Sequence, residues 1–467
     1  MKGYKKLGKN IILLTVGNFA SKVLSFFLVP FYTTVLSTKE YGSADILTTS
    51  INLILPIFSM LIYESVLRFL LDDTNDKKQI ITIGLMINLI GFFVFLFFSP
   101  LCLFISTIKE YYIVFVMYYL SSSLFNITSQ YIKGIENVSL FTLGGVLNTI
   151  FMISFNILFL LYFKIGVFGY LSSFILSQLL VSLLYVIKGH ILKELISIRT
   201  IDFVLAKKML KYSIPMIPNS LSWWISDSSD KYLVTFFKGV SVTGLYSVAY
   251  KIPTILTILT SIFMSAWQIS SVENFGTEEN RKFFSDIYVK YASCTIILCT
   301  GLITFAKIIS QFLFSNNFFD AWIYTPVLLL GFVFNSMSAF FGTVYTAAKK
   351  TQMLFYSTLI GAFVNIFLNI ILIQKYSALG AAIATMLSYF FVWMIRFFNS
   401  HKIMKLDIDI KGNIISYALL LIQVVLVCLD LQYSFFISIF INFLIIKLNF
   451  NLINDVYLLI KKNIVKD

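Results

Sequence analysis

Charged residues are scarce in this sequence. Asp, Glu, Lys and Arg make up 12% of its 467 residues, whereas hydrophobic residues make up 58%. A soluble domain holds about 25% charged residues. The composition therefore excludes an ordinary soluble domain and predicts an all-α polytopic membrane protein.

Cysteine and histidine are also rare, and their positions are uninformative for metal chemistry. The four cysteines lie in apolar runs and form no CxxC pair: Cys102, Cys294, Cys299 and Cys428. Isolated apolar cysteines behave as small packing residues. The two histidines, His190 and His401, lie in predicted loops, away from any cluster of Cys or carboxylates. We therefore expect no metal site, no cofactor and no enzymatic activity.

Apolar runs of about 20 residues, the length that crosses a bilayer, recur from end to end. The first run is too long for the core of a signal peptide, and no small-residue cleavage site follows it, so it is expected to be the first span. The expected spans, about fourteen, are 11–36, 43–70, 79–105, 111–131, 140–163, 167–187, 211–237, 244–270, 286–312, 321–345, 353–374, 378–398, 412–430 and 432–449.

The net charge of +14 is distributed unevenly between the two sides of the membrane. With the amino terminus in the cytoplasm, the inner segments hold 27 Lys and Arg residues, the outer loops five and the spans four. Such a split over short loops is the positive-inside pattern. It predicts that both termini are cytoplasmic and that the charge orients the protein in a cytoplasmic membrane, with no nucleic-acid partner.

Two pairs of segments indicate an internal repeat. The segment beginning at Tyr41 (YGSADILTTSINLILPIF) resembles the one beginning at Gly244 (GLYSVAYKIPTILTILTSIF). The segment ending at Gly169 (FNILFLLYFKIGVFG) resembles the one ending at Gly380 (LNIILIQKYSALG). Spans 1–6 and 7–12 are thus expected to be two six-helix lobes related by a parallel repeat, with the substrate path between the halves.

The repeat predicts three regions of the chain. The amino-terminal lobe and its cytoplasmic linker would occupy residues 1–208, and the second lobe residues 209–400. Two additional helices and a cytoplasmic tail would occupy residues 401–467.

Charges inside the spans are the strongest functional signal. Each lone charge at the bilayer centre costs about 3 kcal/mol on insertion scales, yet Asp227, Asp230 and Lys231 lie together in the outer half of span 7. Asp227 and Lys231 are four residues apart, in the favourable acid-before-base order. The group has two readings: an ion pair that braces helices, or side chains that face a wet cavity.

Three further charges occupy matching places in the two halves. Lys22 lies near the middle of span 1, Asp45 near the outer end of span 2, and Lys251 about two turns into span 8. Together with the span 7 charges they are the candidate substrate-binding residues. Glu64 and Arg68, four residues apart near the cytoplasmic end of span 2, are expected to form a structural or gating pair.

Four segments, in order, resemble a known family of bacterial polysaccharide-export proteins. They are GNFASKVLSFFLVPFYTTVLSTKEYG (17–42), LKYSIPMIPNSLSWW (210–224), SSDKYLV (228–234) and GLYSVAYKIP (244–253). They are similar to the Wzx-type flippases of O-antigen and capsule repeat units, in the superfamily of MATE exporters and the lipid II flippase MurJ. The resemblance covers roughly residues 10–400.

The resemblance implies a function and a site. It implies two six-helix lobes, often with two added helices, and a cationic cavity. It implies movement of an undecaprenyl-diphosphate-linked oligosaccharide from the inner to the outer leaflet. Polysaccharide polymerase and chain-length proteins are the implied partners. Family members often carry an acid followed by Arg in span 7; here Asp230 is followed by Lys231, which binds phosphate as a point charge without a planar fork.

The energetics of such a substrate leave ion coupling open. Each negative charge moved outward gains about 2.3 kcal/mol per 100 mV, so a headgroup of charge about −2 gains roughly 4–5 kcal/mol by the same rule. A coupling cation, H⁺ or Na⁺, is therefore not required, although Asp227 or Asp230 could bind one.

Rival functions come from other classes. A membrane polymerase or ligase would need a long outer loop and a catalytic constellation, and the sequence has neither. A MATE-like exporter of small cations fits poorly with basic midplane residues and two extra helices. A flippase of another lipid-linked precursor, of the lipid II or teichoic-acid type, remains a close alternative.

Overall fold

The structure is a computed structural model that describes residue 24 and residues 26–72, 76–273, 278–348, 350–407 and 410–449. Over these residues the chain is helical, with no strand. It divides into two compact units, Met1–Ser228 and Ser229–Asp467. The boundary falls inside α12 (Ile217–Lys238). The finer division expected near residues 208 and 400 stays a prediction.

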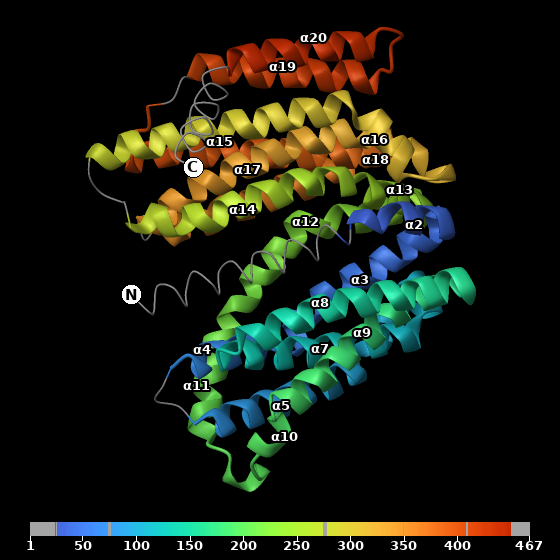
Figure 1. Cartoon of the computed structure of the whole chain (residues 1–467), viewed down its shortest axis with the longest axis vertical. Coiled ribbons are helices and arrows are strands. Elements are labelled where there is room, and N and C mark those ends of the chain that lie inside the picture. Colours follow the sequence, from blue (N-terminus) through green and yellow to red (C-terminus); the bar gives the residue numbers. More distant parts are fainter. Residues whose placement is uncertain are drawn as a thin grey trace, which may run out of the picture. The chain divides into compact units, whose positions relative to one another are not determined.

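Unit 1 is built from the helices that precede α12 and from the first part of α12 itself. They are α2 (Val29–Val35), α3 (Thr38–Phe58), α4 (Ile62–Leu70), α5 (Lys77–Phe98), α6 (Ser106–Glu110), α7 (Tyr112–Gly134), α8 (Val138–Asn156), α9 (Gly166–Lys188), α10 (Ile191–Glu194) and α11 (Phe203–Ser213) (Figure 1). A π-helical segment, Ile157–Tyr162, continues α8, and a 3₁₀ segment, Ser99–Phe104, continues α5.

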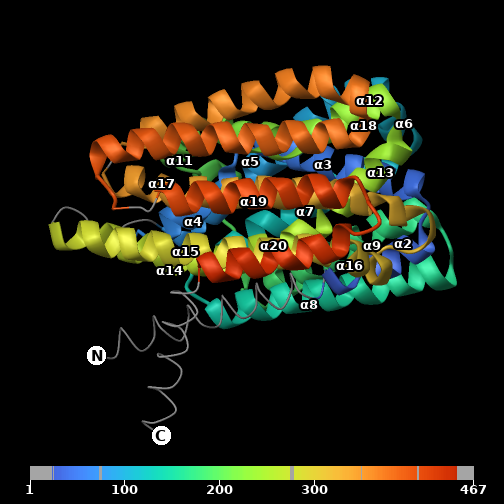
Figure 2. The ribbon, with the colours of Figure 1, turned by 90° about the horizontal axis from the view of Figure 1, so that it is seen from above.

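Unit 2 contains the remaining helices. They are α13 (Val240–Ala249), α14 (Lys251–Glu273), α15 (Glu278–Thr304), α16 (Ala306–Leu313), α17 (Thr325–Ala347), α18 (Thr351–Ile403), α19 (Ile410–Cys428) and α20 (Ser434–Leu448), with a 3₁₀ segment, Asn316–Tyr324, before α17. Most side chains of α17 are buried, which makes it the central helix of this unit. Figures 1 and 2 show α19 and α20 side by side along α15.

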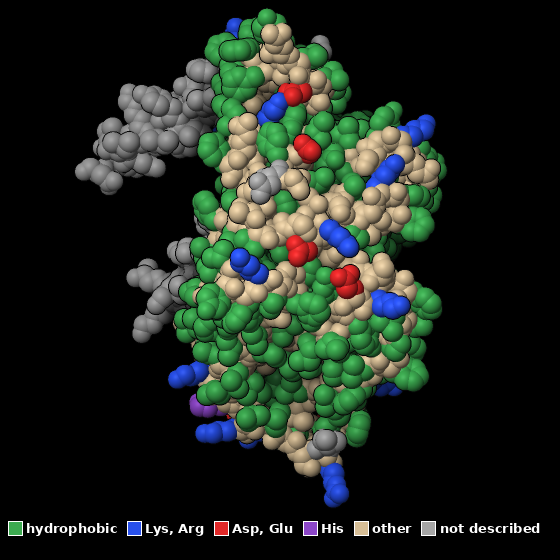
Figure 3. All heavy atoms as spheres, turned by 90° about the vertical axis from the view of Figure 1, so that its right-hand side faces the viewer, with side chains coloured by type: hydrophobic (Ala, Val, Ile, Leu, Met, Phe, Trp, Pro, Cys, Tyr) green, Lys and Arg blue, Asp and Glu red, His purple; other side chains and the backbone are tan. Residues whose placement is uncertain are grey.

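Each expected span from 43–70 onward overlaps described helices, although several spans consist of two helical segments, and the number of about fourteen spans stays a prediction. Seven of the described helices are long and apolar enough to cross a membrane by themselves, and the bent pair α3–α4 makes an eighth. The 53-residue α18 contains the two expected spans 353–374 and 378–398, because Ser377 breaks it with non-helical backbone angles. Many large hydrophobic side chains along these helices are exposed, among them Phe97, Ile113 and Phe363, which fits a lipid environment. Figure 3 looks onto the ends of the helices, where Lys, Arg, Asp and Glu side chains are scattered among hydrophobic ones.

Span 2, expected as one helix over 43–70, is broken in the structure. The axes of α3 and α4 differ by 62°. Met60 and Leu61 adopt left-handed backbone angles at the break, and Pro56 lies one turn earlier, where it removes a backbone donor. A Cβ atom on Gly91 would lie 2.0 Å from the Phe58 carbonyl oxygen. Glycine at this position therefore allows α5 to approach the break.

Local sequence explains where several helices begin. Ser37 caps α3 through a capping box, in which its Oγ accepts from the Glu40 N–H and Glu40 accepts from the Ser37 N–H. Asp76 and Asp202 cap α5 and α11 in the same position. The linker around α11 packs on unit 1, where Ser65 Oγ donates to the Met209 carbonyl.

Polar contacts hold the carboxyl-terminal helices to unit 2. The Gln423 amide of α19 donates to the Thr300 carbonyl and to Thr304 Oγ1 of α15, and accepts from Thr300 Oγ1. Beyond the helix end, Lys307 Nζ lies 2.6 Å from a carboxylate oxygen of Asp430. Because a buried amide needs partners in an apolar environment, Gln423 fixes the position of α19 on α15.

Candidate functional site

Asp230 occupies a buried polar site in unit 2. Its side chain is 2% exposed. One carboxylate oxygen accepts from the hydroxyls of Tyr246 at 2.6 Å, Tyr250 at 2.8 Å and Thr385 at 3.2 Å. The other accepts from the Lys231 backbone N–H at 2.8 Å. Helix α12 thus places an acid where α13 and the second half of α18 supply hydroxyl groups.

Two asparagines of α18 extend this site. Asn365 Nδ2 donates to Thr385 Oγ1 at 3.3 Å, and Asn365 Oδ1 accepts from Asn369 Nδ2 at 2.9 Å. The side-chain amide oxygen of Asn369, Oδ1, is buried and has no hydrogen-bond partner among the described residues. Buried acceptors without partners are rare and need an explanation. The site therefore combines one carboxylate with an amide oxygen that has unused acceptor capacity.

The two lysines of this region lie beside the acidic site. Lys231 Nζ lies 5.9 Å from the centre of the Tyr250 ring, within the range of a cation–π contact. Lys251 is the first residue of α14 and follows Tyr250 directly. Both lysines are partly buried, whereas Asp227, one turn before Lys231 on α12, is exposed. The two acids of span 7 therefore differ in burial, because surrounding side chains enclose only Asp230.

Asp45 of unit 1 is partly buried and lies near three tyrosines. It is one turn after Tyr41 on α3, and it interacts electrostatically with Tyr41 and Tyr170. The ring of Tyr32, from α2, lies 6.5 Å from that of Tyr41 and 5.1 Å from that of Tyr170, from α9. The Tyr32 hydroxyl has no hydrogen-bond partner among the described residues. Asp45 thus lies near tyrosines in unit 1, as Asp230 does in unit 2, where two tyrosine hydroxyls donate to the carboxylate.

The remaining candidates have different settings. Glu64 of α4 is partly buried and accepts from Gln130 Nε2 of α7 at 3.3 Å, while Arg68 is exposed. The expected pairing of Glu64 with Arg68 stays a prediction. Lys22 lies outside the described residues.

The sequence did not reveal most partners of Asp230. Tyr246 follows it by 16 residues, but Thr385 is 155 residues away. The sequence did contain one signal for this site: the polar residues Asn365 and Asn369 lie one turn apart in an apolar span. Asn369 marked the internal repeat together with Asn156, and both have a buried, unpartnered Oδ1.

A buried arginine was also missed. Arg396 was counted among the charges of the inner side, but the structure buries it in unit 2, where it is 4% exposed. Its guanidinium donates to Ser357 Oγ, Thr358 Oγ1 and the Ser338 carbonyl. Position near a span end was a poor guide because α17 and both halves of α18 enclose this side chain.

The chemistry available at the Asp230 site is cation or proton binding. Within the described part of the chain, no group of three or more His, Cys, Asp or Glu residues is placed to hold a metal ion. One carboxylate with hydroxyl and amide oxygens suits a proton or a hard monovalent cation, since such cations prefer oxygen ligands. The neighbouring lysines suit an anion.

Known proteins resemble this chain in sequence. Residues 7–268 match a family described as polysaccharide biosynthesis protein. An uncharacterized membrane protein of Methanocaldococcus jannaschii is 21% identical over 420 residues, which cover 85% of this chain and 99% of that protein. The probable low-salt glycan biosynthesis flippase Agl15 of Haloferax volcanii is 23% identical over 198 residues, 41% of this chain and 42% of that protein.

Solved structures resemble it in fold. The lipid II flippase MurJ, in an inward closed conformation, superposes with a TM-score of 0.71 at 18% identity, over 96% of this chain and 100% of that one. An inward-facing multidrug resistance MATE transporter gives a TM-score of 0.63 at 14% identity, over 83% of this chain and 94% of that one. At these identities the likeness concerns the fold alone, and it confirms the expected all-α polytopic membrane architecture.

Proposed function

This chain belongs to the polysaccharide biosynthesis protein family, and from that premise we propose that it is a flippase for a lipid-linked oligosaccharide. The substrate is an undecaprenyl-diphosphate-linked repeat unit of O-antigen, capsule or exopolysaccharide. It moves from the inner to the outer leaflet of a bacterial cytoplasmic membrane. The observation that carries the proposal is the family match over residues 7–268.

The basic residues of the site support an anionic substrate. Lys231 of α12 and Lys251 of α14 lie in predicted membrane spans, where charge is costly unless it serves a function. A lipid diphosphate must pass an apolar layer, and nearby cations reduce the cost of removing its water. We propose that Lys251, Lys231 and Lys22 lie along the path of the diphosphate and that Asp45 adds to its polarity. Both termini are cytoplasmic in this proposal, and polysaccharide polymerase and chain-length proteins use the product.

A flippase of another lipid-linked precursor is the second candidate. The structural likeness to a lipid II flippase, with a TM-score of 0.71, favours it over a multidrug exporter. The two candidates differ in the sugar carried, and both require a lipid-linked anion.

Deleting the gene tests the function. We expect the deletion strain to lose one surface polysaccharide and to retain its lipid-linked repeat unit in the inner leaflet, because the polar sugars cannot cross the bilayer unaided. The measurement combines polysaccharide analysis with leaflet-selective labelling of the lipid-linked sugar. Normal polymer in a strain without another flippase would contradict the proposal, and accumulation of lipid II would favour the second candidate.

We propose that Asp230 binds the coupling cation, H⁺ or Na⁺. The Asp230→Asn variant should lose cation-dependent transport, because the amide removes the site's negative charge while it keeps the side-chain size. Transport would be measured in proteoliposomes with an imposed Na⁺ or pH gradient, and Na⁺ binding by thermal stabilisation of the purified protein. We expect at least a tenfold loss of the gradient-dependent rate.

Asp227→Asn is the matched control for this experiment. It makes the same change one turn away on the same helix, at an exposed position, and should retain most of the gradient-dependent rate. If wild type and Asp230→Asn respond equally to the Na⁺ gradient, and also equally to the pH gradient, transport is not coupled at this site.

A further inference from the structure

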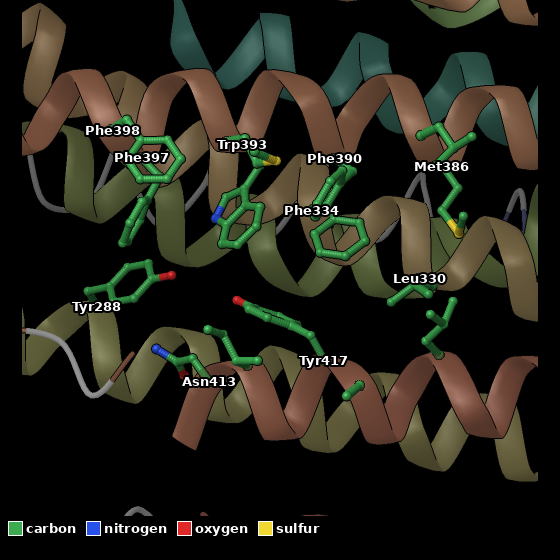
Figure 4. Close-up of a pocket in the computed structure, with 15 residues that line it drawn as sticks. Tyr288, Leu330, Phe334, Met386, Phe390, Trp393, Phe397, Phe398, Asn413 and Tyr417 are labelled. Carbon is green, nitrogen blue, oxygen red and sulfur yellow. The ribbon is translucent and has the colours of Figure 1, made fainter. Parts of the chain in front are cut away.

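An apolar groove runs along unit 2 between α15, α17, the second half of α18, and α19. Its volume is about 600 Å³. Figure 4 shows that aromatic rings form much of its wall, among them Phe334, Phe390, Trp393 and Tyr417. None of the charged residues proposed for transport lines it. The groove is thus separate from the Asp230 site.

The polar groups of the groove gather toward one end. Asn413 and Tyr288 lie at that end, and Leu330 and Met386 lie at the other (Figure 4). Trp393 Nε1 and the Tyr417 hydroxyl are buried and have no hydrogen bond of ordinary length among the described residues, and their polar neighbour is the Tyr288 hydroxyl. The Tyr417 side chain is only 9% exposed. Figure 4 shows both groups turned toward the same part of the groove as the Tyr288 hydroxyl.

The side chains of Tyr288, Trp393 and Tyr417 carry three donor hydrogens but only two acceptor oxygens, so one donor is left without an acceptor inside this cluster. Buried polar groups in native proteins are nearly always hydrogen-bonded, and an indole N–H can only donate. A ligand with an oxygen near Trp393 and Tyr417 and an apolar chain toward Met386 would satisfy both ends of the groove.

The length of the groove matches one leaflet. From Met386 to Phe398 the helix rises about 18 Å at about 1.5 Å per residue. One half of the hydrocarbon core is about 15 Å thick. The positive-inside count predicts that the Asn413 end faces the cytoplasm. Lys402, one turn beyond Phe398 on the same helix face, and Lys405 are exposed at this end.

The volume of the groove matches a whole fatty acyl chain but only part of a polyprenyl chain. A methylene fills about the same ~30 Å³ as a water molecule in the liquid, so 600 Å³ holds about 20 methylenes. A fatty acyl chain is of this size, whereas an undecaprenyl chain of eleven isoprene units is far longer. We propose that the groove binds one acyl chain of an anionic glycerophospholipid from the cytoplasmic leaflet.

In this arrangement an ester oxygen of the lipid accepts the hydrogen bond that the cluster of Tyr288, Trp393 and Tyr417 cannot satisfy internally. Its phosphate lies near Asn413, within the field of Lys402 and Lys405. The acyl chain of the lipid fills the space between α18 and α19, so the lipid stabilises the packing of the α19–α20 hairpin on α18. This site does not depend on the proposed transport function.

Native mass spectrometry of the purified full-length protein tests the site, with phosphatidylglycerol as the probe. Ala418 lines the groove, and the Ala418→Trp variant should lower the phosphatidylglycerol-bound fraction more than fivefold by filling it. Ile415→Trp is the control, because Ile415 lies on the same helix, is exposed and does not line the groove. Equal binding by wild type and Ala418→Trp would overturn the proposal, as would equal retention of phosphatidylcholine.

A second measurement does not require the filled variant to fold. Phosphatidylglycerol with brominated acyl chains quenches nearby tryptophan, and the quenching should fall by at least one third in Trp393→Phe. Unchanged quenching would overturn the proposal. A polyprenyl phosphate that displaces phosphatidylglycerol from wild type, and fails to bind Ala418→Trp, would assign the groove to the transported lipid instead.

Discussion

The Lys251→Glu variant is expected to lose export of the polysaccharide, by more than tenfold, at a normal amount of protein in the membrane. Lys251 is partly buried at the start of α14, next to Tyr250, whose hydroxyl donates to Asp230. Two charges about 4 Å apart interact by about 4 kcal/mol at an effective dielectric constant of about 20. Reversing the sign turns attraction for a diphosphate into repulsion of similar size, so transport should stop.

The matched variants separate charge from size. Lys251→Arg keeps the positive charge and should retain much of the export. Lys375→Glu makes the same change of charge at an exposed lysine and should leave export near wild type. The measurement pairs polysaccharide yield with membrane abundance by immunoblot. Normal export by Lys251→Glu at normal abundance would refute an anion-binding role for this residue, and the same sign reversal at Lys22 tests the other lysine proposed for the substrate path in the first half of the chain.

The fold followed from the sequence because hydrophobic length is a strong local signal. A bilayer requires about 20 apolar residues per helix, so the spans could be placed without long-range information. The break between spans 11 and 12 at Ser377 also fell where the sequence predicted it. The break at Met60 and Leu61 did not, because left-handed angles at non-glycine residues depend on neighbouring helices. Pro56 indicated a bend but not its 62° size.

The candidate site was only half predictable, for a similar reason. The cost of burying a charge drew attention to Asp230, but that cost is offset by groups that lie far away in sequence. Thr385 contacts Asp230 across 155 residues, and a single sequence carries no signal for such pairs. Both Asp227 and Asp230 lie in the outer half of span 7, and only the packing of the helices shows that the first is exposed and the second buried.

Replacing Arg396 is expected to have the second large effect, a loss of protein stability. It has no ion-pair partner among the described residues, and its guanidinium is held by neutral groups of α17 and the first half of α18. Arg396→Ala should lower the melting temperature of the purified protein by several degrees. Truncating a large buried side chain to alanine costs about 2–5 kcal/mol through the cavity that it leaves. The exposed Arg199 offers a control, since Arg199→Ala should change stability by less than about 0.5 kcal/mol.

Arg396→Met distinguishes packing from charge. Methionine keeps much of the volume of the arginine stem and removes a charge whose burial is costly. The groups left behind keep other bonds, because Ser357 Oγ and Thr358 Oγ1 each still donate to the Leu354 carbonyl. We therefore expect Arg396→Met to be within about 1 kcal/mol of wild type, as for other volume-conserving core changes. If the methionine variant melts as early as the alanine variant, the hydrogen bonds of the guanidinium outweigh its packing. If it is stable but inactive in export, the buried positive charge itself is needed for transport.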